Sequence, residues 1–203
     1  MTILITGAAG FIGFHTIQAL MSQGRRVVGV DSLNDYYDVT LKEARLSRLL
    51  VDENFSFIQA NIADKDAMED VIDRHPDITH IIHLAAQAGV RYSLVNPYAY
   101  TNANIEGQLV MLEMARKLEH LEHMMYASSS SVYGTNTKLP FSVDDRTDTP
   151  VSLYAATKKS VELMSHSYAH MFRLPLTGLR FFTVYGPWGR PDMSAFIFVK
   201  KIL

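Results

Sequence analysis

The sequence contains no cysteine, which excludes disulfide bonds and thiolate chemistry and is compatible with a reducing compartment. No apolar run approaches the roughly 18 to 20 residues of a membrane-spanning helix. The N-terminal segment, MTILITGAAGFIG, lacks the basic start of a signal peptide. There is no stripe of lysine and arginine, and the net charge is only −2, so we expect no nucleic-acid partner. Together these absences predict a soluble, cytoplasmic protein.

What the chain does have is a regular alternation of short apolar runs and helical patterns. With 203 residues, 48% of them hydrophobic, it can bury one sizeable core. Strands that are apolar throughout and are separated by helices indicate a parallel sheet covered on both faces, so we predict a doubly wound α/β fold of the Rossmann-like type. We expect strands at residues 2–6, 26–30, 55–60, 80–85, 123–128 and 176–181, and helices at 11–21, 40–50, 64–74, 98–118 and 152–172.

The first expected strand runs into a glycine-rich turn, TGAAGFIG, that opens the first helix. Glycine permits a tight turn and a close approach of the backbone to a pyrophosphate, and the helix N-terminus offers free N–H groups to the anion. The spacing of Gly7, Gly10 and Gly13 is one residue longer than the usual dinucleotide fingerprint, and a glycine-rich turn alone is weak support for a site. Asp31 ends the second strand, where an acid binds the ribose hydroxyls of NAD and repels the 2′-phosphate of NADP; the alternative is a turn residue.

Tyr154 and Lys158 lie four residues apart in SLYAATKKS, within an expected helix, and therefore share one helix face. An ammonium group beside a phenol favours the phenolate and lowers the phenol pKa, which would make Tyr154 a general base. From the spacing alone, a solvent-facing pair without function is the other interpretation. Ser129 and Ser131, in YASSSSVYG, follow the fifth strand, where they either satisfy a turn or face the same crevice.

The eight histidines do not predict a metal site. His80 and His83 lie on alternate faces of a strand, whereas His166 and His170 share a helix face. With no cysteine and no third ligand in view for either pair, we expect no bound metal.

Four motifs together resemble the extended short-chain dehydrogenase/reductase family, which contains the NAD-dependent epimerases and dehydratases. They are TGAAGFIG, HLAAQAGVRYS, ASSSSVYG and YAATK. The resemblance covers essentially all 203 residues, and the run VYGPWGRPDM is narrower in its occurrence than the others. It implies that Tyr154 and Lys158 are the catalytic pair, assisted by Ser129 and Ser131. The cofactor-binding positions that it implies are Gly7, Gly10, Phe11, Ile12, Gly13, Asp31, Asn61, Ile62, Leu84, Ala85, Ala86, Asn104, Tyr154, Lys158 and Phe181.

The resemblance further implies a reaction, the NAD-dependent inversion of C4 of UDP-glucuronate through a 4-keto sugar. Tyr154 would take the proton of the C4 hydroxyl, which Ser129 holds, while Lys158 binds the nicotinamide ribose. Arg190, in GPWGRP, matches an arginine near the sugar carboxylate, and Arg91 is a second candidate for anion binding. By analogy with related enzymes, we expect a homodimer that pairs through the helices near residues 98–118 and 152–172.

Three departures from the family pattern leave alternatives open. Asn61 stands where an aspartate commonly meets the adenine, which implies weaker binding. Ser130 and Ser131 replace the acid pair of the dehydratases, which argues against elimination of water. The chain ends in AFIFVKKIL, a helical pattern without a cap, so we expect an NAD-binding domain over 1–190 and, in 191–203, only the start of a substrate-binding lobe that is largely missing. The other interpretations are a UDP-glucuronate decarboxylase and a truncated NAD-binding module without turnover.

Overall fold

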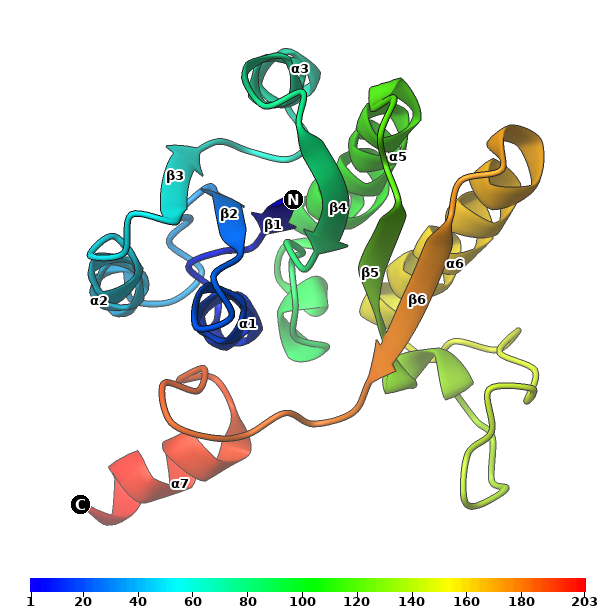
Figure 1. Ribbon diagram of the computed structural model, residues 1–203. Helices are drawn as coiled ribbons and strands as arrows, with labels where there is room; N and C mark the ends of the chain where they lie inside the picture. The colour runs from blue at the N-terminus through cyan, green and yellow to red at the C-terminus, as the bar shows by residue number, and fades with distance from the viewer.

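Six parallel strands form one sheet in the order β3-β2-β1-β4-β5-β6 in the computed structural model of residues 1–203 (Figure 1). The structure describes all of these residues except the side chain of Ala195. The strand order reverses between β1 and β4, and in such sheets a crevice for ligands opens beyond the carboxyl ends of the strands at this point. The predicted doubly wound, Rossmann-like fold is confirmed. The strands are β1 (Thr2–Thr6), β2 (Arg26–Asp31), β3 (Phe55–Gln59), β4 (Ile78–His83), β5 (His123–Ser129) and β6 (Leu176–Phe181).

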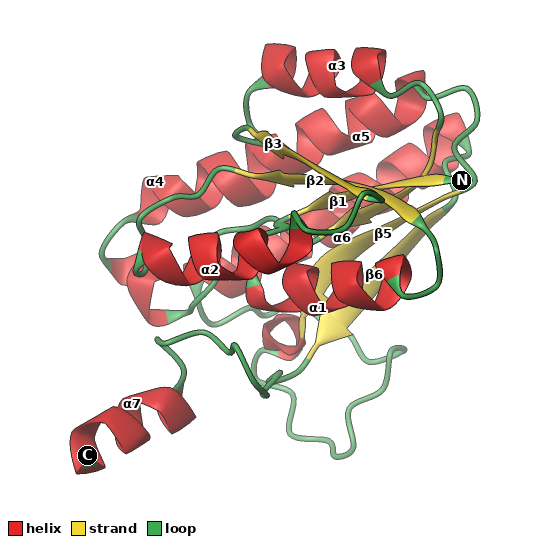
Figure 2. Cartoon of the chain, turned by 60° about the vertical axis from the view of Figure 1, so that its left-hand side comes forward, coloured by secondary structure: helices red, strands yellow, loops and turns green.

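Helices cover both faces of the sheet (Figures 1 and 2). α1 (Phe11–Met21) and α2 (Val39–Leu49) lie on one face. The other face carries α3 (Lys65–Arg74), α5 (Gly107–Lys117) and α6 (Leu153–Phe172). Shorter pieces include α4 (Pro97–Tyr100) and the 3₁₀ turns η1 (Arg91–Leu94) and η3 (Ser130–Tyr133).

The first strand contributes side chains to two apolar clusters, one on each face of the sheet. Side chains alternate along a strand, so Ile3 and Ile5 pack with Phe14 of α1, whereas Leu4 packs with Met111 of α5. Each of these strand residues is at most 2% exposed. Full burial of one such aliphatic side chain stabilises a fold by roughly 1.5–3 kcal/mol. The sheet is therefore held firmly from both sides, and its carboxyl edge is a rigid base for a site.

The fourth strand differs from its predicted range, since β4 spans Ile78–His83 rather than 80–85. Its neighbour β1 ends at Thr6, opposite His83, and the chain then turns at Gly7 with φ of +74°. The N–H of Leu84 donates to the Thr6 carbonyl, and beyond that point β1 offers no further backbone partner. The apolar run in the sequence therefore outlasts the strand. The other expected strands and four of the five expected helices agree with the structure within one residue.

The helix expected at 98–118 is interrupted. After α4 the chain makes a π-helical turn, η2 (Thr101–Glu106), before α5 begins. Such turns insert an extra residue into a helix and are frequent at functional sites. Asn104, a predicted site residue, lies inside this turn. Periodicity in the sequence predicts the helix but not the local widening.

The last helix, α7 (Ser194–Ile202), lies apart from the sheet layers, beyond a long loop that leaves β6 (Figures 1 and 2). It begins without a side-chain cap, as the sequence predicts. Phe198 and Ile202 on this helix are exposed. Over the described residues, no helix of the protein combines the length and the apolar character that a membrane span requires.

Candidate active site

The glycine-rich turn joins β1 to α1 at the carboxyl edge of the sheet. The N–H groups of Gly7 and Ala8 both donate to the Val30 carbonyl at the end of β2, at 2.8 and 3.1 Å. α1 then starts after Gly10, with no side-chain cap and no acidic residue in its first turn. Free N–H groups and the positive end of the helix dipole are thus left for an anion. This geometry is compatible with the predicted binding of a pyrophosphate, which stays a prediction.

Two of the glycines are required by close backbone contacts. A Cβ on Gly7 would lie 2.8 Å from the Ala85 backbone nitrogen, so this turn packs directly against the segment after β4. A Cβ on Gly13 would lie 2.1 Å from the Gly7 carbonyl oxygen, closer than any real contact. The first turn of α1 can therefore approach the loop only because Gly13 has no side chain.

We expect the substitution Gly13→Ala to destabilise the NAD-free protein by roughly 1–3 kcal/mol, because the methyl group pushes on backbone that cannot yield. The displaced turn also weakens dinucleotide binding. Urea denaturation and an NAD titration followed by the fluorescence of Trp188 measure both effects. The control is Gly24→Ala, where φ is +69° and no atom lies within 4 Å, so about 1 kcal/mol of backbone strain is expected without a change in NAD affinity. If Gly13→Ala keeps the stability and the NAD affinity of the wild type, the position tolerates a side chain and the prediction is wrong.

Asp31 ends β2 and is only 9% exposed. Its two carboxylate oxygens accept hydrogen bonds from the N–H groups of Ala9, at 3.1 Å, and Leu33, at 2.9 Å. Asp31 therefore orders the turn, which was the alternative to ribose binding for this residue. Each carboxylate oxygen can still accept a second donor, so the predicted contact with ribose hydroxyls stays compatible with this geometry.

The residues that follow β3 mainly make contacts within the protein. The Asn61 side-chain oxygen accepts from the N–H of Ala63 at 3.1 Å, and the residue is exposed. Ile62 is buried against α5, where a Cβ on Gly107 would lie 2.6 Å from its side chain. Their predicted contacts with the cofactor stay predictions.

A buried histidine, which the sequence analysis considered only as a metal ligand, supports the segment after β4. The Thr6 hydroxyl accepts from the N–H of Ala85 at 3.1 Å and contacts Nδ1 of His83 at 2.6 Å. Burial, together with the nearby Lys158 charge, lowers the pKa of His83 to about 3, so the ring is neutral. His83 thereby fixes the backbone at Leu84 and Ala85, two predicted cofactor positions.

The predicted catalytic residues come together where β5 ends and α6 begins. Ser129 closes β5, and its hydroxyl donates to that of Ser131 at 3.1 Å. Tyr154 lies in the first turn of α6, close enough for the Ser129 hydroxyl to affect its pKa. Lys158 follows one turn later, is 4% exposed, and donates to the Ala127 carbonyl of β5 at 2.8 Å. Four residues from two distant parts of the chain thus lie together at the end of β5.

The predicted lowering of the Tyr154 pKa is wrong for this structure. Burial raises the pKa of Tyr154, and the Ser129 hydroxyl and the Arg190 charge offset only part of the rise. Burial also lowers the pKa of Lys158 to about 8. Attraction between an ammonium and a phenolate alone would lower the phenol pKa, but the desolvation of each group opposes it. The Lys158 ammonium is moreover directed at a backbone carbonyl, which the spacing of the two residues does not reveal.

Asn104 connects three segments of the chain through hydrogen bonds. Its amide nitrogen donates to the Thr157 hydroxyl at 3.0 Å and to the Gln87 carbonyl at 3.1 Å, while its oxygen accepts from the N–H of Gln87 at 2.8 Å. The residue is 2% exposed. Phe181 ends β6 directly beside Ser129 in the strand register. The sequence placed both residues at the site, but the bracing by Gln87 and Thr157 is visible only in the fold.

A polar cluster that was not predicted from the sequence supports the end of β5. Glu162 of α6 accepts from Ser128 at 2.6 Å and forms two hydrogen bonds with Arg180 of β6, at 2.9 and 3.0 Å. Burial raises the pKa of Glu162, but the hydrogen bonds from Arg180 and Ser128 outweigh it and hold this pKa below its ordinary value. The Arg180 guanidinium also lies 5.0 Å from the centre of the Tyr133 ring. The end of β5 is therefore tied to α6 and β6.

The two candidate arginines differ in their setting. Arg190 lies close enough to Tyr154 for its charge to affect the pKa of that phenol, and it is paired with Asp192. Arg91 is exposed at the start of η1. Within the described part of the chain it forms no side-chain hydrogen bond or ion pair, so its predicted role in anion binding stays a prediction.

Arg45, another residue without a predicted role, links the glycine-rich turn to the loop before Arg190. It is 0% exposed. Its guanidinium donates to the Ala9 carbonyl at 2.9 Å and to the Trp188 carbonyl at 2.7 Å. Trp188 in turn packs on Phe14 of α1, with ring centres 5.9 Å apart. The cofactor turn and the Arg190 loop are therefore held against each other by one buried side chain.

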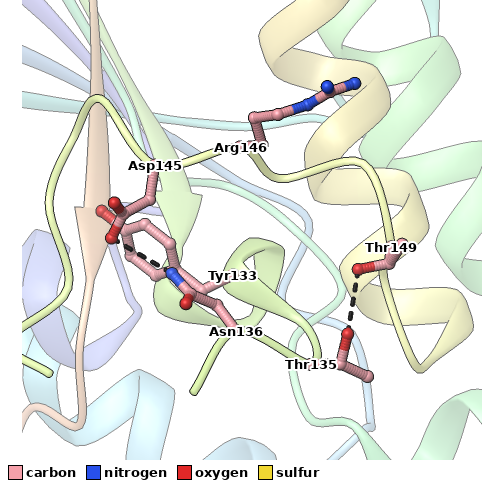
Figure 3. A pocket seen from close by; sticks show the side chains of 6 residues that line it. All are labelled: Tyr133, Thr135, Asn136, Asp145, Arg146 and Thr149. Atoms are coloured by element: carbon pink, nitrogen blue, oxygen red, sulfur yellow. Dashed lines mark hydrogen bonds between the residues drawn. The ribbon is translucent and has the colours of Figure 1, made fainter. Parts of the chain in front are cut away.

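A shallow polar pocket of about 240 Å³ lies elsewhere, in the loop between η3 and α6 (Figure 3). Asn136 donates to Asp145 at 3.1 Å, and the Thr135 and Thr149 hydroxyls lie 3.1 Å apart. Arg146 points its guanidinium away from the other lining residues (Figure 3). None of its lining residues is a predicted site residue, so the pocket is separate from the candidate active site.

Known proteins resemble this chain in sequence and in fold. The pattern of the "NAD dependent epimerase/dehydratase family" matches residues 3–203. "Probable UDP-glucuronate 4-epimerase" of Rhizobium meliloti (strain 1021) is 54% identical over 100% of this chain and 59% of its own length. "Protein CapI" of Staphylococcus aureus is 55% identical, over 100% and 60%.

A solved structure matches as well. The UDP-glucuronic acid 4-epimerase from Bacillus cereus, in complex with UDP-glucuronic acid and NAD, superposes with a TM-score of 0.92 and 37% identity. The match covers 100% of this chain and 63% of that one. The present chain thus spans about 60% of the length of the curated relatives it matches.

Proposed function

Since this chain belongs to the NAD dependent epimerase/dehydratase family, we propose that the protein inverts C4 of UDP-glucuronate with NAD as its cofactor. The observation that carries the proposal is the placement of Tyr154, a partly buried phenol beside the Ser129 hydroxyl and near the Arg190 guanidinium. A proton acceptor, a hydroxyl that can hold a sugar hydroxyl, and a cation for a carboxylate are together what this reaction requires. Relatives with UDP-glucuronate epimerase names support the choice of substrate.

The residues present fit the cofactor. When bound, NAD accepts a hydride from C4 of the sugar and returns it to the opposite face of the 4-keto sugar. The uncapped start of α1 and the close-packed glycines would hold the pyrophosphate. Asp31 would bind the adenosine ribose and disfavour a 2′-phosphate. Lys158, one helical turn from Tyr154, would bind the nicotinamide ribose.

The chain's own residues move the proton. Ser129 hydrogen-bonds the C4 hydroxyl, and Tyr154 removes its proton as the hydride leaves and restores it when the hydride returns. General acid–base catalysis of this kind contributes roughly a hundred- to ten-thousandfold. Since burial raises the pKa of Tyr154 in the structure, the phenolate needs a nearby positive charge, which Arg190 supplies.

Arg190 protects the intermediate from loss of CO₂. A 4-keto glucuronate is a β-keto acid, and it decarboxylates when the breaking C–C bond aligns with the carbonyl π system. A guanidinium that forms two parallel hydrogen bonds with the carboxylate fixes its orientation. Held out of alignment, the carboxylate stays on the sugar and the epimer is the product.

The test is the product formed from UDP-glucuronate by the natural full-length protein, followed by proton NMR. We expect UDP-galacturonate and a stable equilibrium between the two uronates. Formation of UDP-xylose and CO₂ would identify a decarboxylase instead. NAD that copurifies without any turnover would identify a binding module, and either result would refute the proposal.

We further propose that residues 1–190 form the NAD-binding domain and that 191–203 begin a substrate-binding lobe, which the separate position of α7 supports (Figure 1).

We also propose a cytoplasmic homodimer that pairs through α5 and α6. Leu109 and Leu163 support this pairing, since they are 42% and 58% exposed on these two helices. The mass of the protein in light scattering, with Leu163→Glu as the disrupting variant, tests the dimer.

A further inference from the structure

The Arg190 side chain is held by a carboxylate two residues away. Its Nε donates to one oxygen of Asp192 at 3.0 Å, and its Nη2 donates to the other at 2.5 Å. The two side chains are only 22% and 29% exposed. A guanidinium carries five N–H donors in one plane, and this pairing occupies the edge formed by Nε and Nη2. The edge with Nη1 is left for another acceptor.

Asp192 is itself held from the opposite side. The Tyr36 hydroxyl donates to Asp192 at 3.1 Å, and the Tyr36 ring lies 4.8 Å from that of Tyr92. Gly89 closes against the same group, since a Cβ there would lie 2.6 Å from the Tyr36 hydroxyl and 3.7 Å from Arg190. Three separate segments of the chain therefore fix the orientation of one guanidinium.

We infer that Asp192, supported by Tyr36, is a positioning residue that turns the free edge of Arg190 toward the sugar carboxylate and so sets the preference for uronates over neutral sugars. The inference rests on the proposed role of Arg190. A guanidinium on a flexible stem loses rotamer entropy when it binds a ligand, and a partner that has already ordered it removes this cost. A neutral sugar makes no use of that edge.

A second role for Asp192 predicts the opposite effect. If Asp192 merely occupied the place of the substrate carboxylate, its removal would free Arg190 and leave an uncompensated positive charge, so uronates would bind more tightly. The geometry favours positioning, because Asp192 is fixed by Tyr36 as well as by Arg190. The sign of the change in affinity separates the two roles.

The experiment measures binding of UDP-glucuronate and UDP-glucose to the NAD-loaded, full-length protein by calorimetry. A Tyr154→Phe background prevents conversion of the sugars. We expect Asp192→Asn to weaken UDP-glucuronate binding about tenfold, as when a group that orients a metal ligand is removed, and to leave UDP-glucose binding unchanged. Tyr36→Phe, which keeps the ring and its packing, should shift affinity in the same direction by a smaller factor.

The matched control is Asp148→Asn, which breaks another arginine–aspartate pair of the same spacing, Arg146–Asp148, that is exposed. It should change neither affinity. Unchanged or tighter UDP-glucuronate binding in Asp192→Asn would overturn the inference, provided that Arg190→Met still abolishes the preference for the uronate. If Arg190→Met leaves that preference intact, the proposed role of Arg190 fails, and the positioning role of Asp192 fails with it.

Discussion

Replacing Tyr154 with phenylalanine is expected to lower kcat for the inversion of UDP-glucuronate by about a hundred- to ten-thousandfold, because the C4 hydroxyl loses its proton acceptor. The ring remains, and with it the edge-on contact to Tyr100 at 6.1 Å, so folding should be unaffected. NAD binding should be retained, since the glycine-rich turn and Asp31 are untouched. Product formation measured by NMR in the full-length protein gives the rate, and an NAD titration gives the affinity.

Tyr98→Phe is the control for this loss. It removes the same hydroxyl from a side chain that is 82% exposed, and kcat should stay at the wild-type value. An undiminished rate in Tyr154→Phe would show that another group takes the proton. A loss of NAD together with the rate would instead show that the phenol acts by holding the cofactor.

Lys158→Met is expected to abolish turnover and yet to raise the free energy of unfolding of the NAD-free protein. Burial lowers the pKa of Lys158 from 10.5 to about 8. At pH 7 this shift corresponds to about 3 kcal/mol of destabilisation by the buried ammonium group. Methionine removes that cost but also the hydrogen bond to the Ala127 carbonyl, worth about 1 kcal/mol. The net expectation is a gain of about 2 kcal/mol in urea denaturation at pH 7.

The gain should depend on pH in a defined way. Below pH 8 the wild-type lysine is charged in both the folded and the unfolded protein, so the full cost of burial applies. Between pH 8 and 10.5 the folded protein releases its proton first, the wild type recovers stability, and the difference shrinks. Lys65→Met, at a surface lysine, should change stability by less than about 0.5 kcal/mol at either pH. A loss of stability in Lys158→Met at pH 7 would contradict the argument.

Local patterns in the sequence predicted most of the fold. Apolar runs such as TILIT and RVVGV form buried parallel strands, because their residues have no polar face to leave in water. The glycine-rich turn was predictable for the same local reason, since Gly7 and Gly13 meet backbone at distances that no side chain permits. The end of β4 was not, because it depends on where the neighbouring strand stops.

The chemistry of the site was only partly predictable. Spacing placed Tyr154 and Lys158 on one face of a helix, and the fold confirms that placement. Their pKa shifts depend on burial by segments far away in the chain, which no local pattern records. Glu162 and Arg45 were missed for a similar reason. Their partners are the Ser128 hydroxyl in one case and the carbonyls of Ala9 and Trp188 in the other, and a carbonyl leaves no signature in the sequence.

The buried Arg45 has a mechanical consequence. Because it grips the Ala9 carbonyl and the Trp188 carbonyl at once, the chain as far as Trp188 must move as one body with the cofactor turn. Separating them would leave Nη2 of this guanidinium without the Trp188 carbonyl as its acceptor in the protein interior. Since Asp192 is also held by Tyr36 and Arg190, the same body extends through Arg190 to Asp192, and any opening and closing around a sugar carries the Arg190 guanidinium along with the cofactor turn.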